Sequence, residues 1–345
     1  LGYQFNDSLR FGAQILSRNL GVDGNNKFTF GYLYGDYQFE RYFGIRIGKV
    51  RAHHGLYNQE RDIDLLRTNV FLPNAVYHNQ HYTFYSAFYG ASIYGDIPIK
   101  NIGTVEYELY AGLGDEDDES LLLKDNKAQF ESLFGGVIYH MDMRSSKIRG
   151  GVMRWNTPLD GLRFGYSRTY FESKIVFKGL DVVEEVYIDK VELSPIQVWS
   201  AEYTIGDFVF ASEFLRFRQK SNIDLKNNSI VPDFGLKVTT SEGWYFSSVY
   251  RFNSLLEVGV VYSEFFEDKD NKNGDGYSVN HEAWLKDLTL SARIDITENW
   301  LVKAEYHLMD GTAWLPAPGV YDDANSLTNK KQKWNMIALK TTFSF

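Results

Sequence analysis

Residues 288–308 read LTLSARIDITENWLVKAEYHL, two alternating segments joined by a short polar turn. In the first segment Leu288, Leu290, Ala292 and Ile294 share one face, and Thr289, Ser291, Arg293 and Asp295 share the other. In the second segment Trp300, Val302, Ala304, Tyr306 and Leu308 oppose Lys303, Glu305 and His307. Because successive side chains of a β-strand point to opposite faces, each segment predicts a strand with one apolar and one charged face.

The same alternation recurs in segments of about ten residues, a length that spans a bilayer as a tilted strand. Residues 8–18 place Leu9, Phe11, Ala13 and Ile15 opposite Arg10, Gln14 and Arg18, and residues 104–112 place Val105, Tyr107 and Leu109 opposite Glu106 and Glu108. A soluble β-sandwich also alternates, but its strands are usually shorter and its polar face is the outer one. The pattern predicts an all-β fold, a transmembrane antiparallel β-barrel.

The connections between the predicted strands alternate between short and long, as the turns and loops of membrane barrels do. Short turns are predicted at Glu40–Tyr42, Pro98–Asn101, Asn156–Asp160, Gly206–Asp207, Asn253–Ser254 and Thr297–Asn299. Long links are predicted at Ala52–Gln80, Asp115–Ser146, Gly179–Lys190, Lys220–Gly235, Glu267–His281 and Asp310–Lys331. This assignment places the apolar stretch Phe130–Tyr139 inside a long link, as a short helix or a hairpin.

Residues 1–345 are therefore predicted to form a single barrel domain with about fourteen complete strands. Leu1–Phe5 is interpreted as the end of a further strand. An unpaired strand is not tolerated in lipid, so we expect about sixteen strands in the native barrel, with the first hairpin incomplete in this sequence. Residues Thr341–Phe345 alternate and finish on an aromatic residue, which resembles the terminal strand of outer-membrane proteins.

Composition excludes several other classes of protein. The 345 residues contain no cysteine, which rules out disulfides, thiolate metal sites and cysteine nucleophiles. The formal net charge is −9, whereas phosphate binding needs a basic face, so no nucleic-acid partner is expected. No stretch approaches the roughly 18 consecutive apolar residues of a membrane-spanning helix. The sequence begins at Leu1 without a recognisable signal peptide, and we expect that any export signal has been removed or lies outside it.

Two groups of residues carry a family resemblance. The first comprises Gly48–Arg51 (GKVR), Gly55–Asp62 (GLYNQERD) and Leu72–Tyr77 (LPNAVY), and the second is Arg154–Arg163 (RWNTPLDGLR). They resemble segments of Gram-negative outer-membrane porins related to the phosphate-selective type. The resemblance implies a diffusion channel, often trimeric, with the loop after an early strand folded into the pore. It does not imply phosphate selectivity, because the phosphate-selective members use basic ladders in the lumen, whereas this chain mixes Glu with Arg.

The predicted link Ala52–Gln80 is about 29 residues long, well beyond the loops of compact folds. It combines charged with apolar residues, so it is able both to pack and to present charge. We interpret residues 52–80 as an infolded constriction loop. The candidate constriction residues are Arg51, His53, Glu60, Arg61, Asp62, Asp64 and Arg67, with the three arginines expected to face Asp62 and Asp64 across the opening. The second hypothesis is that these charges pair with each other and hold the loop against the wall.

Charged residues on the inferred inward faces of the strands are candidate pore-lining residues. They are Arg10, Arg18, Glu106, Glu108, Arg251, Glu257, Arg293, Lys303, Glu305 and Lys340. Opposed charges in a narrow, partly desolvated pore orient dipolar solutes and discriminate ions by sign. These residues predict a wet interior.

No metal site, cofactor or catalytic residue is predicted. His53 and His54 are adjacent and so point to opposite faces of an extended segment, where they do not share one ion. Residues 268–276 (DKDNKNGDG) look like a calcium loop, but Lys272 stands where an oxygen ligand is needed, which favours a solvated loop. The acidic run Asp115–Glu119 either collects divalent cations that bridge lipopolysaccharide or remains hydrated, and hydration is favoured.

Together these patterns favour a water-filled porin in the outer membrane of a Gram-negative bacterium, for passive diffusion of small hydrophilic solutes and ions. The expected partners are outer-membrane lipid and lipopolysaccharide, the diffusing solutes, and further copies of the chain in a homotrimer. Two alternatives stay open: a secreted all-β carbohydrate-active protein, and a barrel that acts as a scaffold for a partner threaded through it. Acidic residues outnumber basic ones by 45 to 36, so a channel is expected to favour cations weakly.

Overall fold

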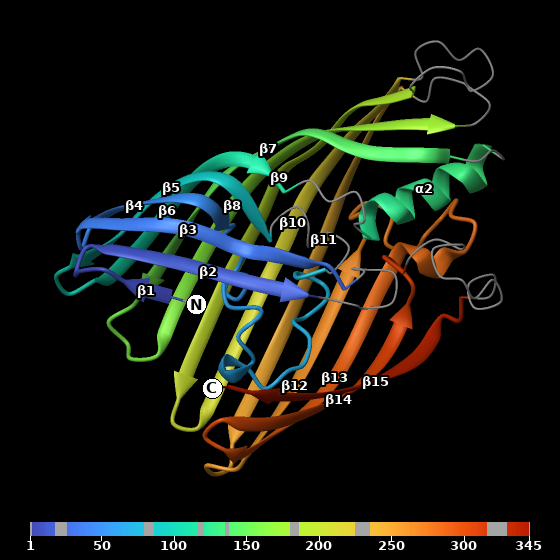
Figure 1. Cartoon of the computed structure of the whole chain (residues 1–345). Helices are drawn as coiled ribbons and strands as arrows, with labels where there is room; N and C mark the ends of the chain where they lie inside the picture. Colours follow the sequence, from blue (N-terminus) through green and yellow to red (C-terminus); the bar gives the residue numbers. More distant parts are fainter. Residues whose placement is uncertain are drawn as a thin grey trace.

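The computed structural model describes residues 2–17, 26–78, 86–115, 121–134, 138–179, 186–224, 235–315 and 330–344. Within these ranges fifteen strands form one antiparallel sheet, in which each strand pairs with its neighbours in the sequence. The strands are β1 (Gly2–Gln4), β2 (Leu9–Ser17), β3 (Phe28–Glu40), β4 (Phe43–Arg51), β5 (Ala87–Ile99), β6 (Gly103–Gly114), β7 (Ile138–Asn156), β8 (Leu162–Gly179), β9 (Val186–Ile205), β10 (Phe208–Asp224), β11 (Gly235–Arg251), β12 (Leu256–Phe266), β13 (Trp284–Thr297), β14 (Trp300–Gly311) and β15 (Lys333–Phe343). Figure 1 shows that the sheet curves strongly and partly encloses an interior.

The all-β antiparallel architecture predicted from the alternation is confirmed. β1 contains only three residues, and β1 and β15 are the two edges of the sheet in the described ranges. The number of strands in the native barrel, sixteen, stays a prediction.

Short turns join the strands at one end of the sheet, which we call the turn end. These turns are residues 41–42, 100–102, 157–161, 206–207, 252–255 and 298–299, and they confirm the six predicted positions. The opposite end, called the loop end, carries the longer connections, including residues 52–86 and 267–283. The short-then-long order predicted from the sequence is therefore confirmed for these connections.

Strands β7 to β11 are longer than the predicted ten residues. They contain 19, 18, 20, 17 and 17 residues, and their ladders continue to the pairs Ile138↔Gly179 and Ile223↔Gly235 at the loop end. Val186 and Asp224, which fall inside the links predicted at Gly179–Lys190 and Lys220–Gly235, therefore belong to strands β9 and β10. Extended pairing gives partners to backbone groups that a polar loop would otherwise leave to water, so these hairpins stay in the sheet.

One helix of 14 residues, α2 (Leu121–Phe134), precedes β7 at the loop end (Figure 1). The prediction that Phe130–Tyr139 lies in a link as a short helix or a hairpin holds for Phe130–Phe134. It is wrong for Ile138 and Tyr139, which already belong to β7. The other helices in the described ranges are two short 3₁₀ segments, η1 (Asp64–Leu66) and η2 (Asn280–Ala283). None of the described helices is long and apolar enough to cross a bilayer.

Alternation separates the two faces of the sheet as the sequence predicts. On the outward face, Leu109, Ile337 and Leu339 are 54%, 71% and 76% exposed. On the inward face, Lys303 and Glu305 are 0% and 2% exposed because other parts of the chain pack against them. Large apolar side chains on the convex, exposed side are what a sheet surrounded by lipid requires.

A hydrophobic core occupies the loop half of the interior. It contains Phe88, Tyr110, Phe171, Val198, Leu215, Phe217, Tyr245 and Phe265 from the strands, Leu56, Val76 and Tyr77 from the connection after β4, and Leu123 from α2. Charged inward residues of the same strands, such as Arg154, Arg163 and Glu202, lie nearer the turn end. Charged side chains therefore face inward in the turn half of this wall, and apolar side chains pack together in its loop half.

Leu109 and Glu106 on β6 give a direct test of which face meets lipid. An arginine on the lipid side near the bilayer midplane costs about 2–4 kcal/mol, because the charge is removed from water. We expect Leu109→Arg to lower the free energy of unfolding in lipid vesicles by that amount, and Glu106→Arg, on the inward face, to lower it by less than half as much. Denaturant titration in vesicles measures both values. Equal losses in the two variants would contradict the assignment of faces.

Candidate functional site

Residues 52–78, here called the inner segment, leave β4 at the loop end and run through the interior of the sheet (Figure 1). Their polar contacts reach the inward faces of strands far apart in the sequence, from β6 to β15. Residues 79 and 80 of the predicted constriction loop lie outside the described ranges. The side chains that these contacts reach lie on the inward faces of their strands, as the period-two alternation predicts.

Glu213 of β10 is the first anchor of the inner segment. Its side chain is 1% exposed and accepts hydrogen bonds from the backbone N–H of Leu56 at 2.8 Å and from Tyr245 at 2.8 Å. Ser200 donates to it at 2.5 Å, and the Tyr77 hydroxyl donates as well. Four donors around one buried carboxyl group partly offset the cost of removing it from water.

Gly55 allows the inner segment to approach this anchor. Its φ of +59° lies in the left-handed region, and a Cβ atom at this position would stand 2.6 Å from a Glu213 oxygen and 2.5 Å from the Tyr77 hydroxyl. Only glycine fits both the conformation and the space. The next residues of the GLYN sequence continue the contact, because the Tyr57 hydroxyl donates to Glu202 of β9.

Asp64 is the second anchor and lies against the last two strands. Its carboxylate is 2.8 Å from the Lys340 ammonium, accepts a hydrogen bond from Thr342 at 2.9 Å, and is 3.9 Å from Lys303. Burial alone would raise the pKa of Asp64, but the hydrogen bonds and charges of Lys340, Thr342 and Lys303 outweigh burial and lower it. Lys303 also donates to the Asp64 carbonyl at 2.7 Å.

Glu305 of β14 is the third anchor. It accepts the backbone N–H groups of Val70 at 2.8 Å and Phe71 at 3.2 Å. His307 stands beside it, 3.2 Å from Glu305 and 3.0 Å from Asp287. Both carboxylates therefore face one imidazole, and one of them also fixes the main chain of the inner segment.

Two further contacts hold the inner segment on β12 and β13. Thr68 donates a hydrogen bond to Glu257, and Arg293 donates to the Leu65 carbonyl at 2.7 Å. Glu257 also pairs with Arg251 at 3.0 Å. Hydrogen bonds to charged groups each stabilise by about 1.5–3 kcal/mol, so the set fixes the segment firmly.

The charged residues of the inner segment contact each other. Arg51 forms an ion pair with Asp62, and the Arg67 guanidinium is 3.4 Å from Asp64. Arg61 donates to Asn58 at 3.4 Å. Two of the three arginines thus meet the two aspartates in ion pairs. An opening between the arginines and the aspartates stays a prediction. These contacts match the second hypothesis, in which the charges hold the segment in place.

Paired charges of alternating sign line the turn half of the interior. On β2 to β6, Arg10 contacts Asp36 at 3.2 Å, and Arg46 contacts Asp36 at 3.4 Å and Glu108 at 3.3 Å. On β8 and β9, Arg163 contacts Glu202 at 2.9 Å. On β11 and β13, Arg251 contacts Asp295, which also accepts a hydrogen bond from Arg293 at 2.7 Å. We call this set the charge belt.

Three candidate residues remain. Glu106 faces inward and accepts a hydrogen bond from Asn156 at 2.6 Å. Glu60 lies in the inner segment with an exposed side chain. Arg18 falls outside the described ranges. The inward placement of the other strand candidates follows from their contacts with the inner segment or the charge belt.

Sequence reasoning missed several members of the site, namely Asp36, Arg46, Arg163, Glu202, Glu213, Asp287 and His307. All of them sit on inward faces of strands, so the alternation that identified Glu106 and Glu108 would also have found them. Glu213 is harder to find, because its inward neighbours Ala211 and Leu215 are apolar.

The two histidines after β4 point to different partners. The His53 imidazole contacts Glu108, and His54 contacts the Val76 carbonyl at 2.9 Å. In the part of the chain that the structure describes, no group of three or more His, Cys, Asp or Glu residues is arranged to hold a metal ion. The calcium-like loop is a polar turn in which Asp268 accepts the N–H of Asp270 at 3.0 Å. Residues 116–119 of the acidic run lie outside the described ranges.

Comparison with solved structures identifies the fold. The chain is similar to "Outer-membrane expressed OmpT of Vibrio cholerae", with a TM-score of 0.59 and 12% identity over 99% of this chain and 86% of that one. It is also similar to "Anion-selective porin from Comamonas acidovorans" (TM-score 0.55, 10% identity, 100% and 87% covered) and to the outer-membrane channel DcaP of Acinetobacter baumannii (0.55, 9%, 100% and 83%). The chain therefore has the transmembrane β-barrel fold of these outer-membrane proteins. Neither a protein-family model nor a curated protein sequence matches it.

Asp64 is expected to stabilise the inner segment through its charge. Removing one partner of a buried ion pair costs about 3 kcal/mol or more, because the remaining charges lose their compensation. Asp64→Asn should therefore lower the thermal midpoint in detergent and expose the segment to proteolysis. Glu60→Gln, which changes an exposed carboxylate of the same segment, is the matched control. A thermal midpoint equal to that of wild type in Asp64→Asn would contradict the anchor.

His54 predicts an acid-dependent loss of stability. Burial lowers the pKa of His54 from 6.5 to about 4, so the folded chain keeps the imidazole neutral while the unfolded chain takes up a proton. This stability is fully present above pH 6.5 and falls by roughly 3 kcal/mol as the pH drops from 6.5 to 4. Thermal midpoints across this range should fall less steeply in His54→Gln than in wild type. Parallel curves would show that His54 does not titrate in this way.

Proposed function

We propose that the chain forms a water-filled channel in the outer membrane of a Gram-negative bacterium, through which small hydrophilic solutes and ions diffuse passively. The observation that carries the proposal is the charge belt inside a barrel whose outward face is apolar. Charged side chains in the interior of a barrel keep a path for water, since burying them without one is costly. The turn end would face the periplasm and the loop end the exterior.

In this proposal the inner segment narrows the channel. It crosses the interior and is held by Glu213, Asp64 and Glu305, so it reduces the open cross-section without moving freely. The charges that border the remaining space come mostly in pairs of opposite sign. Paired charges select weakly, and the net charge of −9 tilts the preference toward cations. Phosphate selectivity is not part of the proposal.

Two other functions are less well supported. A secreted carbohydrate-active protein would be soluble, which the exposed apolar side chains of the outward face disfavour. A scaffold for a threaded partner would require a free interior, whereas the inner segment already lies there. A homotrimer is proposed because one protein of similar fold, the in-vitro folded OmpT of Vibrio cholerae, has a trimer form. The size of the protein in detergent tests the oligomeric state.

Planar-bilayer recording tests the channel directly. The wild-type protein should give steady single-channel currents, and a tenfold KCl gradient should give a small reversal potential of the sign that reports cation preference. Absence of steady current would reject the channel and favour the scaffold alternative. A strong anion preference would reject the weak cation selectivity and leave conduction intact.

Arg61 and Asp62 test whether the inner segment borders the conducting path. Arg61→Ala and Asp62→Ala should shift the reversal potential in opposite directions, because each removes one charge beside the path. Lys286→Ala is the control, since Lys286 lies on the outward face of β13 beside Glu264 at 3.6 Å. If both variants conduct like wild type but melt at a clearly lower temperature, the two residues only hold the segment in place.

A further inference from the structure

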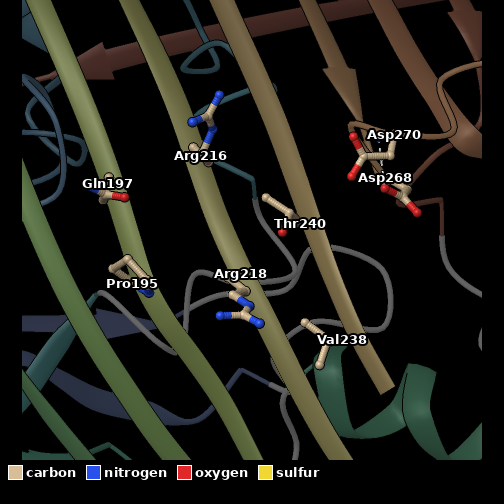
Figure 2. A pocket seen from close by; sticks show the side chains of 8 residues that line it. All are labelled: Pro195, Gln197, Arg216, Arg218, Val238, Thr240, Asp268 and Asp270. Atoms are coloured by element: carbon tan, nitrogen blue, oxygen red, sulfur yellow. Dashed lines mark hydrogen bonds between the residues drawn. The ribbon is translucent and has the colours of Figure 1, made fainter. Parts of the chain in front are cut away.

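A cavity of about 480 Å³ lies on the sheet near the loop end, away from the inner segment (Figure 2). It is lined by Pro195 and Gln197 from β9, Arg216 and Arg218 from β10, Val238 and Thr240 from β11, and Asp268 and Asp270 from the loop after β12. Figure 2 shows the two arginines on β10 between the residues of β9 and β11, with the aspartates to one side. Four successive elements of the barrel thus contribute to one polar hollow.

The cavity opens on the outward face. Leu215 and Phe217 are 3% and 4% exposed and belong to the interior core, so the alternating residues Arg216 and Arg218 point the other way. The Arg216 side chain is 47% exposed. A ligand in this cavity therefore meets the barrel from outside and has no access to the charge belt.

Aromatic residues fix the level of the cavity relative to a bilayer. Phe214, Trp199 and Tyr166 lie on the same outward face, one step nearer the turn end, with ring centroids 5.6 Å apart for Trp199 and Phe214 and 5.5 Å for Tyr166 and Trp199. Aromatic side chains of this kind gather where the hydrocarbon meets the headgroups. The cavity begins directly beyond them, at the level of the headgroups of the outer leaflet.

The cavity has cationic groups suited to phosphate. Arg216 donates two hydrogen bonds to Glu242, at 3.0 and 2.6 Å, and Lys272 is 3.6 Å from the same carboxylate. One acid is therefore shared by two cations. Among the residues that the structure describes, none forms an ion pair with Arg218. A guanidinium group matches phosphate oxygens with two parallel hydrogen bonds.

The other polar groups of the cavity are suited to a sugar. Asp268 and Asp270 are acceptors, which disfavours a bare phosphate ion but fits the hydroxyl groups of a sugar that carries one. Gln197 and Thr240 add a side-chain amide and a hydroxyl. The aromatic residues next to the cavity form an apolar surface that acyl chains contact. A soluble sugar phosphate has no apolar chain to make this contact.

We propose that this cavity binds the phosphorylated sugar headgroup of an outer-leaflet glycolipid. Arg216 and Arg218 hold the phosphate, Asp268 and Asp270 accept hydrogen bonds from the sugar, and the acyl chains lie against Trp199 and Phe214. The inference rests on the proposed location in the outer membrane but not on conduction. It assigns one binding site on the barrel to lipopolysaccharide, which the sequence analysis names as an expected partner.

Binding of three probes to the full chain in detergent micelles tests the proposal. The probes are lipid A, its enzymatically dephosphorylated form, and glucosamine 1-phosphate as a soluble sugar phosphate. Lipid A should bind at least tenfold more tightly than either of the others, and its binding should weaken at high salt. Equal affinity for the dephosphorylated lipid would overturn the role of phosphate. Equal affinity for glucosamine 1-phosphate would overturn the lipid as the ligand.

Variants locate the binding site. The double variant Arg216→Ala/Arg218→Ala should lose at least tenfold in affinity for lipid A, and Arg218→Ala alone, which breaks no ion pair of the described chain, at least threefold. Lys286→Ala removes a cation from the same outward face and should change affinity less than twofold. Unchanged single-channel conductance shows that each variant is folded. Conducting variants that bind lipid A like wild type would overturn this site and leave the channel proposal standing.

Discussion

Hydrogen bonding between consecutive antiparallel strands constrains every other feature of this molecule. Once a strand pairs on both sides, its residues have only two directions left, outward or inward, and a shift of one residue would exchange them all. The ladders run in sequence order from β1 to β15, so each charged inward residue is placed by its own strand. The position of the inner segment depends on this placement, because the side chains that it contacts come from strands as distant as β6 and β15.

The inner segment shows how irregular backbone is accommodated inside a barrel. Its N–H groups need acceptors that the sheet does not offer, since the main chain of the strands is already paired. Glu213 and Glu305 supply them, accepting the N–H groups of Leu56, Val70 and Phe71. Carboxylates that would be expensive to bury alone are compensated by the same contacts. The wall and the segment therefore stabilise each other.

The sequence predicted the strands and turns well because period-two alternation and turn residues are local signals. It predicted that Lys303, Glu305 and Arg293 face inward for the same reason. It did not predict which charges would meet: Asp64 pairs with Lys340 and Arg51 with Asp62, and such choices depend on distances set by the whole fold. It also underestimated β7, β9 and β10, which extend into the predicted long links, whereas β8 and β11 reach the loop end close to their predicted bounds.

The long strands β7 to β11 make the rim of the barrel uneven. At about 3.3 Å per residue they extend for roughly 55–65 Å, far more than a bilayer needs even when tilted. Other strands, such as β4 with 9 residues and β12 with 11, are much shorter. In the proposed orientation, with the loop end outside the cell, these strands extend farther from the bilayer than the shorter ones. A large molecule that approaches the loop end would therefore contact β7 to β11 first.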